Sequence, residues 1–393
     1  MSSIRPGITI AVFLAIVVAA ARAAPERPAG KDIPALEGVS LNKMKFDGSD
    51  FVQKHDDGRI TRFTVDPEMQ RFTDRLFARY DVPAGAAVML NSRTGRVITL
   101  SQYLGNPRSA QIPSVAFDPS PPAASLFKIV TTSALLERGG VTLDTKTCYH
   151  GGSQKLRIHN LEDSQRDDSA CASLEAALGR SINSIFAKLS DRNLDPGVLE
   201  EYANRFGFNR EIPFDIAIGK SEADVPKDRL ERARTAAGFW HTHMSPIHAA
   251  VIAQAVAQGG AMLRPYIIDE VLDDKGNTIY EGAPEFVGRP ISASTARALR
   301  GAMTYTVRKG TARKAFRDRA GAPFLPGMEI AGKTGTLTGR KPYRAYSWFM
   351  AIAPADDPEV ALSVLVVNEP KWRIKSAAFA AQLLNKYFED RLR

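Results

Sequence analysis

The stretch Ser125-Leu126-Phe127-Lys128 has the form S-x-x-K and follows a proline-rich segment, residues 118–124, that cannot be helical. A mostly apolar run from Ile129 to Leu136 comes next and ends at two glycines, which is typical of a buried helix. A helix that begins near Ser125 places Lys128 on the same face as the serine hydroxyl. It also places Ser125 at a helix N-terminus, where unpaired N–H groups favour developing negative charge. Taken alone, the motif favours an N-capping serine with an incidental lysine, because serine is a preferred N-cap residue.

A second short motif, Ser181-Ile182-Asn183, lies between two runs of helical composition, residues 172–180 and 184–189. Ser181 and Asn183 are expected to project the same way from a short extended stretch in this turn. A second hydroxyl there can relay a proton to a leaving amine, and the amide of Asn183 can hold a carbonyl group of a substrate. The alternative is a pair of N-capping side chains that open the next helix.

A third motif, Lys333-Thr334-Gly335-Thr336, lies in an alternating stretch that is typical of a strand and that meets a turn at residues 338–340. A glycine inside a strand usually allows another backbone to approach closely, and here a peptide substrate could add as an antiparallel strand. Lys333 would supply positive charge to a substrate carboxylate, and the Thr336 hydroxyl could bond the same group. The N–H groups of Thr336 and Ser125 would form an oxyanion hole. A structural strand with a solvent-facing lysine is the alternative.

Together, the three motifs predict a serine acyl-transfer site in which a lysine, rather than a histidine, activates the nucleophile. The predicted catalytic residues are Ser125, Lys128, Ser181, Asn183 and Lys333, and the predicted substrate-binding residues are Thr334, Gly335 and Thr336.

From about Ala86 to its C-terminus, the chain resembles the transpeptidase domain of penicillin-binding proteins, within the serine β-lactamase and D,D-peptidase superfamily. The stretches Tyr202–Phe208, Ser245–Ala250 and Ser347–Pro354 resemble this family as well. The resemblance implies that Ser125 is acylated by a peptidoglycan stem peptide ending in D-Ala-D-Ala. It also implies transfer of the peptide to an amine acceptor and covalent capture by β-lactam antibiotics.

The expected fold is α+β, an α/β sandwich of the penicillin-binding transpeptidase and β-lactamase type. An antiparallel five-stranded sheet would be flanked by helices, with an all-helical lobe inserted at about residues 140–300. The segments that carry this expectation are a helix over Arg71–Tyr80, a hairpin over residues 86–100, a buried strand over Val360–Val367 and a helix over Ser376–Phe388. Residues 24–66 are expected to be a linker or N-terminal extension, and residues 67–393 the transpeptidase domain, a short class B-like form without a large pedestal.

Three other functions remain open: a D,D-carboxypeptidase, a serine β-lactamase, and a non-catalytic penicillin-binding sensor or scaffold. The β-lactamase is disfavoured because the second motif is not followed by an obvious glutamate-containing loop of the E-x-x-x-N type, although Asp215 and Glu222 lie in about the right region. A sensor would usually carry a signalling domain or several membrane spans.

The N-terminus is typical of an export signal. Arg5 precedes an apolar stretch, Gly7 to Ala21, that is shorter than the roughly 20 residues of a membrane span, and Ala21-Arg22-Ala23 fits a cleavage site. Residues 1–23 are therefore expected to be a signal peptide or a signal anchor. The protein is expected to be periplasmic, or to lie on the extracytoplasmic face of the membrane and associate with it through the N-terminus.

The net charge of +9 suits anionic cell-wall polymers, and no nucleic-acid recognition module is visible. Stem peptides and β-lactams are the expected partners, with cell-wall synthesis proteins as further candidates. In an oxidising compartment Cys148 and Cys171 should form a disulfide. We expect no cofactor and no metal, because the spacing of His241-Thr242-His243 is a poor metal signature.

Overall fold

A five-stranded antiparallel sheet forms the centre of the computed structural model, which describes residues 33–105, 114–340 and 342–389. The export signal expected over residues 1–23 lies outside the described residues. In spatial order the strands are β14 (Ala331–Arg340), β15 (Tyr343–Ala353), β16 (Val360–Asn368), β4 (Ala84–Asn91) and β5 (Val97–Leu104). All nine residues of β16 are buried, as befits the middle strand. β14 lies at the edge, so one side of its backbone is free to meet another chain.

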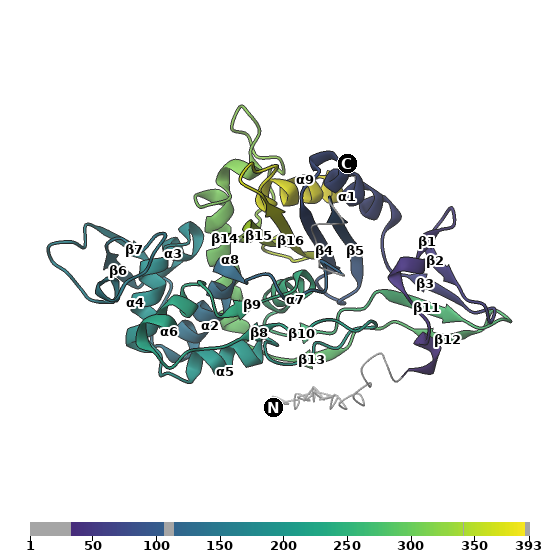
Figure 1. Ribbon diagram of the computed structural model, residues 1–393, viewed down its shortest axis with the longest axis horizontal. Helices are drawn as coiled ribbons and strands as arrows, with labels where there is room; N and C mark the ends of the chain where they lie inside the picture. The colour runs from purple at the N-terminus through teal and green to yellow at the C-terminus, as the bar shows by residue number, and fades with distance from the viewer. Residues whose placement is uncertain (1–32, 106–113, 341, 390–393) are drawn as a thin grey trace, which may run out of the picture.

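Helices cover both faces of this sheet (Figure 1). α1 (Pro67–Tyr80) and α9 (Ser376–Glu389) pack on one face, and α7 (Pro246–Ala257) and α8 (Ala293–Arg308) pack on the other. The helix expected over Arg71–Tyr80 begins four residues earlier, because Asp66 caps its first turn and Pro67 is preorganised for the first helical position. All 12 residues of α7 are buried between the sheet and the helical region. The α+β architecture with a five-stranded antiparallel sheet is confirmed.

The region between β5 and β14 begins with the helical segments that carry the first two motifs. Besides α7 and α8, its α-helices are α2 (Lys128–Arg138), α3 (Leu174–Arg180), α4 (Asn183–Asn193), α5 (Val198–Arg205) and α6 (Arg229–Ala236). The prediction of an all-helical insert at about residues 140–300 was wrong in detail, because short strands interrupt the helices. They pair as β6 (Lys146–Tyr149) with β7 (Ala170–Ser173), β8 (Glu222–Ala223) with β9 (Thr242–His243), and β10 (Met262–Leu263) with β13 (Phe286–Gly288).

A second five-stranded sheet forms an arm at the right of Figure 1. Its strands are β1 (Lys45–Phe46), β2 (Phe51–Lys54), β3 (Ile60–Phe63), β11 (Ile268–Leu272) and β12 (Thr278–Glu281). Residues 33–66, which the sequence suggested as a linker or extension, thus supply three short strands to this sheet. The other two strands, β11 and β12, follow α7 in the chain. The central pair of the sheet, β3 with β11, joins segments that are distant in the chain, and local sequence periodicity carries no information on such a pairing.

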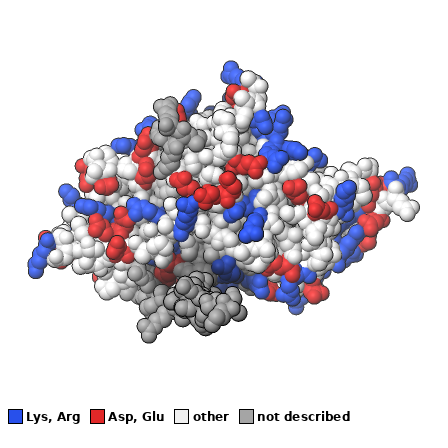
Figure 2. All heavy atoms as spheres, turned by 180° about the vertical axis from the view of Figure 1, so that it is seen from behind, with Lys and Arg blue, Asp and Glu red and all other residues white. Residues whose placement is uncertain are grey.

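The surface and the helices add two observations. Acidic and basic side chains are interspersed over most of the face shown in Figure 2, without the continuous basic stripe that would follow a nucleic-acid backbone. Among the described residues, no helix is long and apolar enough to cross a membrane.

Candidate active site

Ser125 lies in a short 3₁₀ turn, Ala124–Phe127, that leads directly into α2. Ala124 has a φ of 51°, in the left-handed region that residues with a side chain rarely adopt. β15 fixes the approach to this turn, since the indole N–H of Trp348 donates to the Pro122 carbonyl at 2.9 Å. The serine is therefore held at the start of a helix by contacts with the central sheet.

Lys128 is completely buried, and its Nζ lies within hydrogen-bond distance of three oxygen atoms. It lies 2.8 Å from Ser125 Oγ and 2.8 Å from Asn183 Oδ1, and it also bonds the backbone carbonyl of Ala237. Burial, and then the nearby charge of Lys333, hold the pKa of Lys128 well below its usual value. A neutral lysine beside a serine hydroxyl can accept the hydroxyl proton.

The second motif occupies the junction between α3 and α4. Ser181 ends α3 in the left-handed conformation, with a φ of 57°, and Asn183 is the first residue of α4. The Asn183 Nδ2 donates to the Ser153 carbonyl at 2.7 Å, which turns its Oδ1 toward Lys128. The motif is thus a tight helix-to-helix turn rather than the short extended stretch that the sequence suggested.

Lys333 is also completely buried, although it lies on the edge strand. Its Nζ donates to Ser181 Oγ at 3.0 Å and to the Thr334 carbonyl at 2.9 Å. Burial lowers the pKa of Lys333 to about 7. From the sequence, the charge of Lys333 was expected to contact a substrate carboxylate directly. In the structure the amino group of Lys333 lies against Ser181. Its direct partner is therefore the hydroxyl of the second motif.

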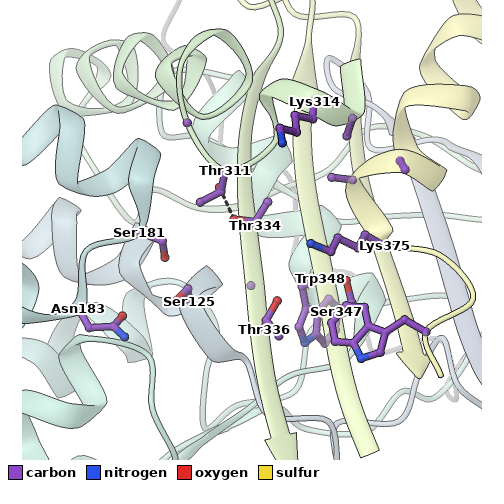
Figure 3. Close-up of a pocket in the computed structure, with 16 residues that line it drawn as sticks. Ser125, Ser181, Asn183, Thr311, Lys314, Thr334, Thr336, Ser347, Trp348 and Lys375 are labelled. Atoms are coloured by element: carbon purple, nitrogen blue, oxygen red, sulfur yellow. Dashed lines mark hydrogen bonds between the residues drawn. The ribbon is translucent and has the colours of Figure 1, made fainter. Parts of the chain in front are cut away.

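The rest of the third motif faces Ser125 from β14. Thr334 and Thr336 point into the space beside Ser125 (Figure 3), and the Thr334 hydroxyl lies 2.5 Å from that of Thr311. Gly335 allows a close approach, because a Cβ there would come within 3.4 Å of the Ser125 backbone nitrogen and 3.2 Å of Trp348 Cβ. The strand extends to Arg340, past the turn expected at residues 338–340, because β15 pairs with it along its whole length.

Two cavities of about 800 and 830 Å³ meet at this site. Ser125, Asn183 and Thr336 line both of them. The first cavity runs over β14 and β15 toward α9, and the second runs toward Trp240 and Tyr343. Ser125 therefore lies where two separate ligand segments could meet.

Sequence reasoning missed the loop that follows α6. Ala237 supplies the carbonyl that bonds Lys128, and Gly238, with a φ of 79°, packs against the backbone of Ala124 and Ser125. A glycine directly after a helical run was the only signal in the sequence. Its position against Ser125 depends on the tertiary fold, so the motifs alone could not reveal it.

Cys148 and Cys171 face each other across the β6–β7 pair and form a disulfide. The loop that it closes spans 23 residues in sequence. The segment after Cys148 leads to Ser153, whose carbonyl bonds Asn183. The disulfide thus braces a segment that contacts the site.

Replacing both cysteines by serine is expected to lower the free energy of unfolding by about 3 kcal/mol, because the unfolded chain regains loop entropy. Urea unfolding of the parent and the double variant measures the difference. Two free thiols titrated in the unfolded, unreduced parent would contradict the pairing.

Other candidates from the sequence lie elsewhere. Asp215 is paired with Arg264 at 2.7 Å, and Glu222 lies on β8; neither lines either of the two cavities. His241 contacts Glu231 at 3.1 Å. Within residues 33–105, 114–340 and 342–389, no group of three or more metal-ligating side chains occurs.

Residues 85–388 match the family model of the penicillin binding protein transpeptidase domain, and the chain belongs to this family. This membership confirms the resemblance drawn from the three motifs. Stage V sporulation protein D of Bacillus subtilis (strain 168) is 28% identical over 376 residues, which cover 89% of this chain and 56% of that protein. The peptidoglycan D,D-transpeptidase PbpA of Mycobacterium tuberculosis (strain H37Rv) is 26% identical over 317 residues, covering 72% and 62%. The chain therefore spans less than two thirds of the length of these curated relatives.

Solved structures show the same fold. The D,D-transpeptidase domain of a peptidoglycan glycosyltransferase from Eggerthella lenta superposes with a TM-score of 0.70 at 25% identity, covering 84% of this chain and 82% of that one. Penicillin-binding protein A from M. tuberculosis, in an imipenem acyl-enzyme complex, superposes with a TM-score of 0.68 at 24% identity, covering 84% and 79%.

Proposed function

We propose that this chain is a serine D,D-transpeptidase of peptidoglycan synthesis, with residues 67–393 as its catalytic domain. Its substrates are stem peptides ending in D-Ala-D-Ala, and β-lactams are covalent ligands of the same serine. The observation that carries the proposal is the buried Lys128, whose Nζ lies 2.8 Å from Ser125 Oγ in a setting that lowers the pKa of the amine. The family and its named relatives support the substrate class.

In the first half-reaction, Ser125 Oγ attacks the penultimate D-alanine carbonyl while Lys128 takes the hydroxyl proton. The oxyanion is held by the N–H groups of Ser125 and Thr336. Ser181, backed by Lys333 at 3.0 Å, relays a proton to the departing D-alanine amine. The hydroxyls of Thr334 and Thr336 bind the terminal carboxylate, and Asn183 holds a carbonyl group of the donor peptide.

The second half-reaction favours an amine over water. Among the described residues, no aspartate or glutamate lines either cavity, so no carboxylate is placed to activate water against the acyl-enzyme. The same feature disfavours rapid hydrolysis of β-lactams. Because peptidoglycan lies outside the cytoplasm, the proposal places the domain on the periplasmic or extracytoplasmic side, where cell-wall synthesis proteins are candidate partners.

The test supplies a D-Ala-D-Ala donor with and without an amine acceptor and measures both products, with Ser125→Ala as the inactive control. We expect slow hydrolysis alone and a cross-linked product that grows with acceptor concentration. Fast hydrolysis without an acceptor-dependent product would make the protein a carboxypeptidase, and rapid turnover of penicillin would make it a β-lactamase. A sensor or scaffold would give neither product.

The acylation rate is expected to depend on pH in a bell shape. It should rise as Lys128 loses its proton, because burial, and then the charge of Lys333, hold the pKa of Lys128 well below its usual value. It should fall as the pH rises through about 7, where Lys333 changes from cation to neutral amine and no longer supports Ser181 with a charge. The falling limb should approach about tenfold per pH unit.

Penicillin acylation measured between about pH 6 and 9 checks this profile. Lys333→Arg keeps the charge at every accessible pH and should remove the falling limb, whatever its absolute rate. An unchanged falling limb in that variant would exclude Lys333 as its source.

A further inference from the structure

The first cavity has a strongly basic far wall. Lys314 comes from the 3₁₀ turn Arg313–Phe316, and Lys375 immediately precedes α9. Both are exposed, and in Figure 3 the amino groups of both side chains point toward β14, on the side of Thr334 and Thr336. Neither lysine forms an ion pair with any part of the chain that the structure describes.

Two further features make this wall attractive to an anion. The N-terminus of the 14-residue helix α9 contributes Ala377 and Ala378 to the lining, and a helix N-terminus carries partial positive charge. No acidic side chain in the described residues lines the cavity to offset the two lysines. The cavity is therefore suited to bind more negative charge than the two threonine hydroxyls could hold on their own.

This cavity also receives the part of the donor that leaves. Thr334, which lines only this cavity of the two, would bind the terminal carboxylate, so the departing D-alanine exits here. An incoming amine must attack the ester carbonyl from the same side, because the leaving and attacking nitrogens occupy equivalent positions in the two half-reactions. An acceptor whose amine-bearing carbon also carries a carboxylate reproduces the group that has just left.

We propose that Lys314 and Lys375 are specificity-determining residues that select an acceptor with a carboxylate beside its attacking amine, as in the D-centre of an amino acid. The proposal rests on the proposed transpeptidase function. In the step, the neutral amine nitrogen forms a bond to the acyl carbon and the bond from that carbon to Ser125 Oγ breaks. The proton lost by the amine returns to Ser125 Oγ through Lys128 and Ser181.

The test uses an N-acyl-D-alanyl methyl thioester, whose leaving group has no carboxylate, so that acylation does not depend on the lysines. The acyl-enzyme is offered D-alanine or D-alaninamide, and the ratio of the two transfer rates is measured at one pH. Lys314→Met and Lys375→Met keep the aliphatic stem and remove the charge. Lys309→Met, an exposed lysine near this turn that does not line the cavity, is the matched control.

We expect each single variant to lower the preference for D-alanine by about two- to fivefold and the double variant by about tenfold. Transfer to D-alaninamide should stay unchanged, and Lys309→Met should keep the parent preference. An unaltered preference in the double variant would overturn the proposal, as would an equal fall of transfer to both amines. If the parent forms the acyl-enzyme but transfers it to neither amine, the transpeptidase function itself fails, and the acceptor proposal fails with it.

Discussion

Lys128→Arg is expected to slow acylation of Ser125 by about a thousandfold. A positioned general base typically contributes 10²–10⁴-fold, and arginine keeps the charge but cannot give up its proton at any accessible pH. The larger guanidinium would also have to fit where Nζ now meets Ser125, Asn183 and the Ala237 carbonyl. The time course of labelling with a fluorescent penicillin measures the rate.

Lys188→Arg is the matched control for this substitution. Lys188 is equally buried but lies in α4, where its Nζ bonds Asp168 at 2.8 Å and the Cys148 carbonyl at 3.0 Å. Lys188→Arg measures how replacing a buried lysine by the larger arginine away from the site affects the protein. This variant should be labelled by penicillin at nearly the parent rate. If penicillin labelled Lys128→Arg at the parent rate, Lys128 would be excluded as the general base.

Gly238→Ala is expected to slow acylation by about a hundredfold while the protein stays folded. The added Cβ would lie 2.4 Å from the Ala124 carbonyl oxygen and 2.9 Å from Ser125 Cα, so the backbone around the nucleophile must move. A displacement of about 1 Å at a reacting group can cost about a hundredfold in rate. Labelling kinetics give the effect on the site, and urea unfolding gives the effect on stability.

Gly140→Ala separates displacement of the nucleophile from backbone strain. Gly140 has a φ of 62°, so alanine there must also adopt the left-handed backbone conformation, at a free-energy cost of roughly 1–2 kcal/mol. Unlike at Gly238, nothing lies within 4 Å of the added Cβ. It should lose stability and keep the parent labelling rate. Equal labelling rates in the two alanine variants would show that Gly238 does not position Ser125.

Local sequence was sufficient for the parts of the site that depend on short-range geometry. The S-x-x-K spacing predicts that Lys128 lies beside Ser125, because three residues make nearly one helical turn. The glycine of the third motif predicts close approach by the backbone of a peptide substrate; in the structure Gly335 lies close to the backbone of Ser125 in the same chain. Both inferences need only the period of a helix or a strand.

Long-range contacts were not predictable in this way. The contacts of Ala237 and Gly238 with Lys128 and Ser125 could not be predicted, because no local pattern links the α6–β9 loop to α2. The burial of Lys333 against Ser181 also depends on how the helical region closes over β14. Lysines on an edge strand are usually exposed, so the sequence predicted an accessible charge on Lys333. In the structure Lys333 is buried instead.

The direct test of the central claim is the location of the covalent adduct. The protein is incubated with penicillin, digested and analysed by mass spectrometry, with Ser125→Ala and Ser181→Ala treated in parallel. We predict one adduct in the parent, on the peptide that contains Ser125; Ser181→Ala should carry it at the same position more slowly, and Ser125→Ala should carry none. An adduct on Ser181, or undiminished labelling of Ser125→Ala, would contradict the assignment of Ser125 as the nucleophile.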